Sequence, residues 1–293
     1  MDRFVAEDGP GIRTSVFLKG CPLKCVWCHS PQSQSPQPQL TFLSSRCIGC
    51  GACVKACPQD AQIVSRAERR VLWEKCDDCG ECAETCPSRA LEMAGEWLSV
   101  QQVVNLVERD SVYYRNSGGG VTFTGGEPTA QPDFLASCLQ ACHDKGIHTA
   151  LDTCGLAKWA VFEAILPYVD LVLYDMKLMD CRRHQQLAGA GNRLISSNLK
   201  SINERGKPIW VRIPLIPGYT DSPENLQQIA EFVSVLDGVE KVSLLPYNTA
   251  SGAKYLSIGK KYALEHLGEH PREAATAFTE IFSRLGLRAE VGR

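Results

Sequence analysis

The chain has 293 residues, a length that suits one large domain with a small one, or a single barrel that carries an insertion. Its 31 basic and 33 acidic side chains give a net charge of -2 without a basic stripe, which argues against nucleic acid as the main partner. The first residues lack the apolar stretch of a secretory signal, and no run of ~18 apolar residues could span a membrane.

Fifteen cysteines are the most unusual feature of the composition. Without a signal or a membrane span, we expect a cytoplasmic protein, and thiols stay reduced in the cytosol. The cysteines therefore indicate ligands of metal clusters and not disulfides.

The first expected strand covers 14–19, and three cysteines follow it directly. Cys21, Cys25 and Cys28 have the spacing C-x3-C-x2-C, with no fourth ligand nearby. A 4Fe-4S cluster normally takes four thiolates, so three leave one iron with an open site that a small molecule can occupy. This spacing predicts a reactive, catalytic cluster and not one that only carries electrons.

A proline-rich connector at 30–39 leads to two further runs of cysteines, each with the ferredoxin spacing C-x2-C-x2-C-x3-C-P. In two-cluster ferredoxins the fourth cysteine of each run binds the cluster of the other run. The spacing therefore predicts one 4Fe-4S cluster on Cys47, Cys50, Cys53 and Cys86, and a second on Cys76, Cys79, Cys82 and Cys57. Pairs of the form C-x2-C also bind zinc, but zinc does not require doubled four-cysteine runs that each end in proline.

Two groups of potential ligands fall outside these runs. The four remaining cysteines show no ligand spacing, and we expect them to pack in the core as small apolar side chains: Cys138, Cys142, Cys154 and Cys181. Of the six histidines, only His29 adjoins a predicted ligand, and the others are expected to be structural or on the surface.

Outside the cysteine-rich stretch, short apolar strands alternate with helical patterns, which is typical of repeated βα units around a parallel sheet. Strands are expected at 14–19, 121–124, 148–152, 171–175, 209–213 and 242–245, and helices at 99–114, 132–145, 159–166, 194–205 and 223–236. The expected fold class is α/β, a partial (β/α)6 TIM-like barrel with an inserted ferredoxin-like two-cluster domain. We place the barrel in 1–44 and 95–293 and the inserted domain in 45–94.

Polar residues gather where the expected strands end, which is the working face of a β/α barrel. Gly125 and Gly126 can present bare backbone to a ligand, and the Glu127 carboxylate can receive an ammonium group, although Gly-Gly also forms simple turns. Asp175 and Lys177 share one side of an extended segment, where they either bind a ligand or form a structural ion pair. The glycines at 118–120 are expected to be a flexible lead-in, because no Lys-Ser/Thr of a phosphate loop follows.

These motifs make the chain resemble the radical S-adenosylmethionine enzymes and, within them, the glycyl radical enzyme activating enzymes of the type with an inserted ferredoxin-like domain. The three-cysteine motif is typical of the whole superfamily, whereas Asp8-Gly-Pro-Gly-Ile-Arg13 and the insertion are typical of the activating enzymes. The resemblance spans nearly the whole chain. The matching segments are 8–14, 119–128, 152–155, 174–177, 211–218 and 244–248.

The resemblance implies that the open iron on Cys21, Cys25 and Cys28 binds the amino and carboxylate groups of S-adenosylmethionine. The implied contacts are Gly125, Gly126 and Glu127 for the methionine ammonium, Lys177, Arg212 and Asn248 for the carboxylate and ribose, and Trp27, Cys28 and His29 for the adenine. Asp152, Thr153 and Asp175 resemble a monovalent cation site, and Met176 lies in the same cofactor-binding motif. Asp8 is a candidate contact for the incoming glycine loop.

The resemblance also implies the reaction and its partners. A reduced cluster passes one electron to the bound sulfonium, and the resulting 5'-deoxyadenosyl radical takes a hydrogen atom from a backbone glycine of a glycyl radical enzyme. The cofactors carry this chemistry, and the protein positions and shields them. Flavodoxin or ferredoxin would supply electrons through the two inserted clusters, and the protein would be a monomer without nucleic-acid or membrane partners.

Two other functions are consistent with parts of the sequence. One is a radical S-adenosylmethionine enzyme that acts on a small molecule or another peptide residue, against which the 8–13 motif argues. The other is a multi-cluster electron-transfer protein, against which the three-thiolate cluster argues. Two departures from the family pattern are a short segment before residue 8, which predicts a truncated first strand, and Asn248 where some members carry histidine.

Overall fold

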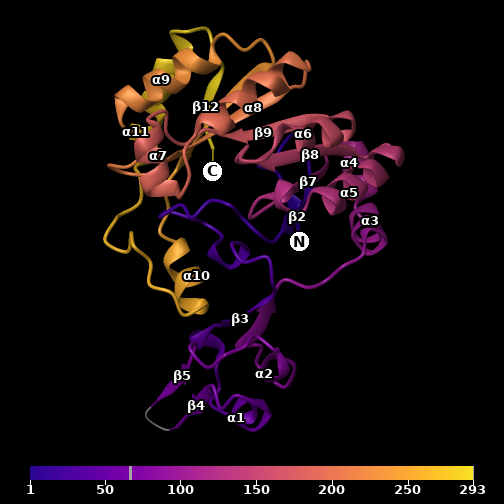
Figure 1. Cartoon of the computed structure of the whole chain (residues 1–293), viewed down its shortest axis with the longest axis vertical. Coiled ribbons are helices and arrows are strands. Elements are labelled where there is room, and N and C mark those ends of the chain that lie inside the picture. The colour runs from indigo at the N-terminus through magenta and orange to yellow at the C-terminus, as the bar shows by residue number, and fades with distance from the viewer. Residues whose placement is uncertain (66–67, 293) are drawn as a thin grey trace.

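The protein is built on one eight-stranded sheet, shown in Figure 1, which draws a computed structural model that describes residues 1–65 and 68–292. The strand order is β1-β2-β7-β8-β9-β10-β11-β12, in which β1 is antiparallel to β2 and all later neighbours are parallel. Its strands are β1 (Asp2–Val5), β2 (Arg13–Leu18), β7 (Gly120–Gly125), β8 (His148–Thr153), β9 (Leu171–Asp175), β10 (Ile209–Leu215), β11 (Val239–Pro246) and β12 (Ala289–Val291).

Six of these strands, β2 and β7 to β11, are the ones that the sequence predicts, and a mixed α/β fold with a parallel sheet is confirmed. The edge strands β1 and β12 were not predicted. β1 is mostly exposed and β12 has three residues, so neither carries the apolar run of a buried parallel strand. The expected truncation of the first strand is absent, because β2 pairs with β7 over all six of its residues.

Helices pack on the sheet around one large apolar core. Within the described residues, no helix is long and apolar enough to cross a membrane. α7 is almost entirely polar, and one of its two buried residues is His184, which explains why apolar periodicity did not predict it. The helices outside the insertion are α3 (Val100–Glu108), α4 (Ser111–Ser117), α5 (Pro132–Asp144), α6 (Trp159–Ile165), α7 (Cys181–Ala188), α8 (Arg193–Glu204), α9 (Pro223–Val233), α10 (Ser251–Ser257) and α11 (Arg272–Ser283).

The single helix predicted at 99–114 is in fact two helices, α3 and α4, which meet at Asp110. The buried Asp110 carboxylate accepts hydrogen bonds from Thr14 Oγ1 at 2.8 Å and from Arg3 Nε at 2.9 Å. Tyr114 Oη in turn donates to Thr14 Oγ1 at 2.6 Å. Contacts with Arg3 and Thr14, which are distant in sequence, therefore hold Asp110 at the break between α3 and α4. Helical periodicity alone cannot reveal such contacts.

Gly119 and Gly120 form a close approach between backbones and not the flexible lead-in that the sequence suggested. A Cβ atom on Gly119 would collide with the Ile12 carbonyl oxygen, and one on Gly120 would collide with the His148 carbonyl oxygen. The missing side chains therefore allow β2 and β8 to lie directly against this end of β7.

Residues 39–94 form a small module that projects away from the eight-stranded sheet (Figure 1). Its base is the antiparallel pair β3 (Gln39–Phe42) and β6 (Leu91–Ala94). Because β3 precedes residue 45, the base of the module includes residues before the predicted boundary, and the division at 45 and 94 stays a prediction. The other elements of the module are α1 (Ala52–Ala56), β4 (Gln62–Val64), β5 (Arg69–Val71) and α2 (Glu81–Glu84).

The backbone of this module repeats itself in register with the two cysteine runs. Both α1 and α2 follow a left-handed glycine. Left-handed residues recur with the interval that separates Cys47 from Cys76, in the pairs Gly49 and Asp78, Gly51 and Gly80, and Asp60 and Arg89.

Candidate active site

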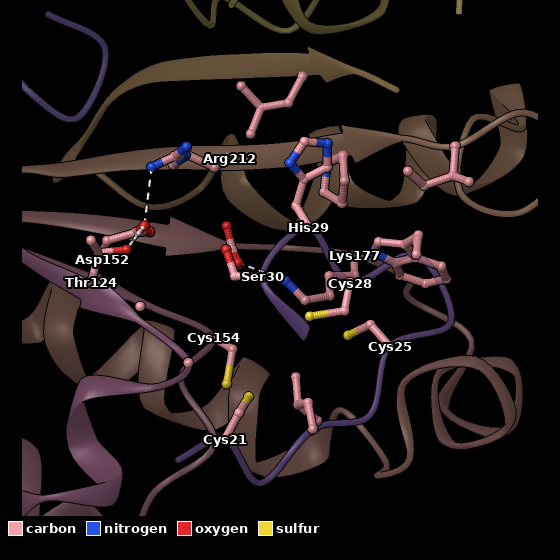
Figure 2. Close-up of a pocket in the computed structure, with 18 of the residues that line it drawn as sticks. Cys21, Cys25, Cys28, His29, Ser30, Thr124, Asp152, Cys154, Lys177 and Arg212 are labelled. Carbon is pink, nitrogen blue, oxygen red and sulfur yellow. Dashed lines mark hydrogen bonds and ion pairs between the residues drawn. The ribbon is translucent and has the colours of Figure 1, made fainter. Parts of the chain in front are cut away.

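A cavity of about 390 Å³ opens where the parallel strands end, and Figure 2 shows part of its lining. This volume is in the range of small-molecule sites. The strands bring together residues that are far apart in the sequence, as expected at this face of a β/α barrel. Most predicted site residues line the cavity: Cys21, Cys25, Trp27, Cys28, His29, Gly125, Gly126, Asp152, Thr153, Asp175, Lys177, Arg212 and Asn248.

The three-cysteine loop after β2 is held by backbone hydrogen bonds on both sides. Gly20 N donates to Ser33 O, and Lys24 N donates to Ala188 O, each at 2.8 Å. Burial raises the pKa of the Cys21 thiol to about 12. A bound cationic centre would oppose this effect of burial and hold such thiols as thiolates.

The donor set fits an iron-sulfur cluster and not a single metal ion. Within residues 1–65 and 68–292, no three His, Cys, Asp or Glu side chains converge closely enough to hold one ion. A cluster does not need that convergence, because each thiolate binds a different iron. Figure 2 shows the sulfur of Cys21 across an open space from those of Cys25 and Cys28, which suits a cluster held between them.

Buried charges form the rest of the polar lining: Figure 2 shows Arg212 beside Asp152, and Lys177 next to Cys28. Lys177 Nζ lies 2.6 Å from Asp175 Oδ2. Arg212 Nη1 lies 3.1 Å from Asp152 Oδ2 and 3.3 Å from Asp8 Oδ1. Burial raises the pKa of Asp152 above its usual value, although the charge of Arg212 opposes the shift. The cavity therefore offers ammonium, guanidinium and carboxylate groups, a set that suits a zwitterion with hydroxyl groups.

His29 and Asn248 form one wall of the cavity. The His29 ring nitrogen Nε2 lies 2.9 Å from Asn248 Oδ1, and Lys254 Nζ donates to the His29 carbonyl oxygen at 2.9 Å. Trp27 and Tyr247 belong to a small apolar core behind this wall. The combination of an apolar surface and polar edge groups suits a nucleobase.

Glu127 lies behind the cavity wall, with only 1% of its surface exposed. Its carboxylate accepts hydrogen bonds from Thr129 Oγ1 at 2.7 Å, Thr153 Oγ1 at 2.8 Å and Cys154 N at 2.7 Å. The side chain therefore joins the end of β7 to the end of β8. Its predicted role toward an ammonium group stays a prediction.

Two other predicted residues also lie outside the lining. Met176 is buried in the main apolar core. Asp8 contacts Arg212, and its Oδ2 accepts a hydrogen bond from Ser15 Oγ at 2.7 Å.

Cys154 was missed as a cavity residue. It is buried, as predicted, but it also lines the cavity, and Figure 2 shows its sulfur next to that of Cys21. Its place directly after the predicted strand at 148–152 is the signal that could have identified it. Cys138 and Cys142 are fully buried, as predicted, whereas Cys181 at the start of α7 is only partly buried. The other lining residues that were not predicted are Leu23, Ser30, Thr124, Pro214, Ile216, Leu245, Pro246 and Tyr247.

A second, smaller cavity lies in the projecting module and brings together cysteines of both runs. Its lining includes Cys47, Cys50 and Cys53 from the first run and Cys86 from the second. The other predicted group of cysteines is also close together: burial and the nearby thiols Cys76, Cys57 and Cys79 raise the pKa of Cys82 to about 11. This is the grouping that an exchange of fourth ligands requires, while the clusters themselves stay a prediction.

Comparison with known proteins agrees with this fold and site. Residues 15–233 match the family model described as the Radical SAM superfamily. The match begins in β2 and includes the three-cysteine loop, the inserted module and the polar ends of β7 to β10.

Two curated relatives narrow the assignment. The trans-4-hydroxy-L-proline dehydratase activating enzyme of Clostridioides difficile is 43% identical over 291 residues, which cover 98% of this chain and 95% of that protein. The choline trimethylamine-lyase activating enzyme of Oleidesulfovibrio alaskensis is 40% identical over 90% of this chain and 87% of its own. The chain therefore belongs to the radical S-adenosylmethionine superfamily and, within it, to the glycyl radical enzyme activating enzymes.

A solved structure shows a similar fold. A domain of a pyruvate-formate lyase-activating enzyme from Bacteroides vulgatus matches with 33% identity and a TM-score of 0.51. The match covers 60% of this chain and 99% of that domain.

Proposed function

We propose that this protein cleaves S-adenosylmethionine reductively in order to remove a hydrogen atom from a backbone glycine of a partner glycyl radical enzyme. The observation that carries this proposal is the cavity in which three free thiols face Lys177 and Arg212. Relatives named as activating enzymes for a dehydratase and a lyase support a partner of the same kind.

Cys21, Cys25 and Cys28 would hold the reactive 4Fe-4S cluster. When bound, the cluster and S-adenosylmethionine supply the one-electron chemistry that yields the 5'-deoxyadenosyl radical. The hydrogen bonds of Gly20 and Lys24 hold the cysteine loop in place, and the apolar wall keeps water away from the cavity.

The glycines after β7 would receive the methionine ammonium group. Gly125 has a φ of +124°, and a Cβ atom there would collide with the Leu18 carbonyl oxygen. The missing side chain therefore lets the end of β7 lie directly against the backbone of β2, beside the cysteine loop. Glu127 directly follows Gly126, and its carboxylate adds negative charge near these glycines.

The rest of S-adenosylmethionine would lie along the polar wall. Lys177, Arg212 and Asn248 would bind the carboxylate and ribose, while Trp27 and the 28–29 backbone would border the adenine. The carboxylates of Asp152 and Asp175, with Thr153 and the adjacent Met176 segment, would form a monovalent cation site. These assignments are supported by the shared cavity and by the ion pairs of both cations.

The projecting module would be an inserted ferredoxin-like domain at 45–94, with two 4Fe-4S clusters that bring the total to three. Its repeated backbone and the mixed set of cysteines in its cavity support this assignment. A flavodoxin or ferredoxin would supply electrons to it, and one chain would act as a monomer.

The segment that contains Asp8 would border the glycine loop of the partner. Asp8 touches Arg212, a residue of the cavity wall, so a peptide near Asp8 would be close to the reacting group. The partner's glycine must enter this cavity, which requires part of the partner to open.

The proposed function is tested by a variant in which Cys21, Cys25 and Cys28 are all changed to alanine. After anaerobic reconstitution we expect it to lose about a third of about twelve irons and to release no 5'-deoxyadenosine. Cys138→Ala, a buried cysteine outside both cavities, is the matched control and should keep both properties. Release of 5'-deoxyadenosine by the triple variant would show that these cysteines do not form the site of S-adenosylmethionine cleavage.

A further inference from the structure

The surroundings of the two predicted cluster sites in the projecting module differ in charge. The backbone repeat aligns each residue near the first cysteine run with one near the second. Over residues 46–60, five aligned pairs differ in charge, whereas Arg46 and Lys75 are both basic. The five pairs are Ile48 with Asp77, Gly49 with Asp78, Ala52 with Glu81, Lys55 with Glu84, and Asp60 with Arg89.

The cavity of the first run is lined by Ile48 and by the neighbours of Arg46 and Arg89, and Lys55 lies on α1 beside it, so its surroundings are basic. We call these four residues the basic face. Around the second run the acidic residues outnumber Lys75, and Asp60 lies on this side because Gln59 Nε2 donates to Asp77 Oδ2 at 3.0 Å.

The basic face is open to solvent. Ile48 is 68% exposed, and the side chains of Cys50, Lys55 and Arg89 are also exposed. Lys55 and Arg89 form no ion pair within residues 1–65 and 68–292. Arg46 adds a third basic group, whose ion pair with Glu92 at 3.6 Å is exposed and therefore weak.

The β3–β6 ribbon shows which half of the module is nearer to the barrel. At its barrel end Gln39 pairs with Ala94, and at its far end Phe42 pairs with Leu91. Asp78 of the second run accepts a hydrogen bond near the barrel end, from Leu40 N at 2.8 Å. By contrast, Leu91 at the far end lines the cavity of the first run.

The barrel end of the ribbon also contacts the strand that precedes the catalytic cysteine loop. A Cβ atom on Gly95, directly after β6, would collide with the side chain of Lys19. Lys19 follows β2 and precedes Cys21 by two positions. The second run therefore lies between the first run and the active site.

We propose that an acidic one-electron carrier protein docks on the basic face formed by Arg46, Ile48, Lys55 and Arg89. This inference deepens the proposed function of the module and rests on it. Cys47, Cys50, Cys53 and Cys86 would hold the cluster that accepts the electron from the reduced carrier. The cysteines of the second run would hold the cluster that relays it toward Cys21, Cys25 and Cys28. No bond forms or breaks during these transfers, and the carrier is oxidised by one electron for each electron delivered.

The charge of the face decides between possible occupants. Electron-transfer complexes are small and transient, so charge attraction contributes strongly to their formation. An acidic carrier is attracted to the basic face and repelled by the acidic surroundings of the second run. Exposed Ile48 beside Cys50 provides an apolar contact next to the predicted cluster ligand.

The experiment uses the holoenzyme and a bacterial flavodoxin of negative net charge. The test variant is Lys55→Glu with Arg89→Glu, and the matched control is Glu84→Lys with Asp60→Lys at the equivalent positions. Calorimetry gives the Kd of flavodoxin, and stopped-flow absorbance gives the rate at which reduced flavodoxin is oxidised. We expect the test variant to bind about 10-fold more weakly at low salt, with a smaller salt dependence, and the control to bind at least as tightly as the parent.

Dithionite-driven cleavage of S-adenosylmethionine separates this proposal from the proposed function. Both variants should cleave it at the parental rate, because neither changes the active site. A parent that binds flavodoxin but cleaves nothing with dithionite would overturn the proposed function and leave the docking face intact. Unchanged flavodoxin binding in the test variant, or weakening only in the control, would overturn the docking face.

Discussion

Glu127 is the residue that joins the two segments of the site that follow β7 and β8. Its buried carboxylate holds Thr129, Thr153 and the backbone of Cys154, and it directly follows the glycines proposed to bind the ligand ammonium. Arg13 has a comparable role below the cavity, where its buried guanidinium donates to Thr122 Oγ1 at 2.7 Å. Residues in the family motifs therefore serve the fold as well as the ligand.

We predict that Glu127→Ala lowers the free energy of unfolding by about 2–4 kcal/mol, because it leaves buried donors without an acceptor. It should also weaken S-adenosylmethionine binding, since the ends of β7 and β8 lose their common anchor. Glu127→Gln keeps the shape of the side chain and one carbonyl acceptor. Its stability and its affinity for S-adenosylmethionine should therefore lie between those of the parent and of Glu127→Ala. Chemical denaturation and calorimetric Kd values check this, and parental values for Glu127→Ala would contradict it.

Among single residues, sequence spacing predicted which cysteines lie together but did not predict the ion pair between Asp8 and Arg212. Ligand spacing is local, so Cys21, Cys25 and Cys28 could be assigned from the sequence, and the structure places them around one cavity. The contact between Asp8 and Arg212 joins residues 204 positions apart, and no local pattern predicts such a pair.

At the scale of elements, the junction of α3 and α4 depends on Asp110. The hydrogen bond from Arg3, together with that from Thr14, lowers the pKa of Asp110 below its usual value. A carboxyl group of this kind stabilises the fold above its unfolded pKa of about 3.9, and the stabilisation is lost as the pH falls through the lower folded pKa.

We predict that Asp110→Asn is less stable than the parent at pH 7, by about 1 kcal/mol for the weakened Thr14 hydrogen bond alone. The difference should shrink below about pH 4, where the parental carboxyl becomes protonated. Urea denaturation of both proteins at each pH cancels the effects of pH on the rest of the chain. Asp144→Asn, at an exposed position, is the control. A stability difference that stays constant with pH would contradict this role of Asp110.

Apolar patterns predicted the six central strands and missed the elements that tertiary contacts define. The strands β7 to β9 are buried on both faces and read as apolar runs. The edges β1 and β12 and the polar helix α7 lack such runs. Even so, α7 supports the three-cysteine loop through the hydrogen bond from Lys24 N to Ala188 O.

At the scale of the whole molecule, the projecting module is attached near the face of the sheet that carries the cavity. The parallel strands bring the polar residues to one face, and the β3–β6 ribbon connects that face to the projecting module (Figure 1). The rule that functional residues lie at the carboxyl ends of parallel strands predicted this face. Ferredoxin spacing predicted the grouping of cysteines across the two runs. The sequence could not predict which half of the module lies nearer to the barrel, because that depends on contacts such as Asp78 with Leu40.

The central claim is that this protein places a radical on a glycine of its partner, and electron paramagnetic resonance tests it most directly. Under reducing conditions, with S-adenosylmethionine and a cognate glycyl radical enzyme, we expect a doublet signal on the partner. Changing the partner's radical-loop glycine to alanine should abolish the signal, because alanine adds a methyl group where the backbone must approach closely. A set of candidate partners without any radical, while 5'-deoxyadenosine is still released, would contradict the account and favour a small-molecule substrate.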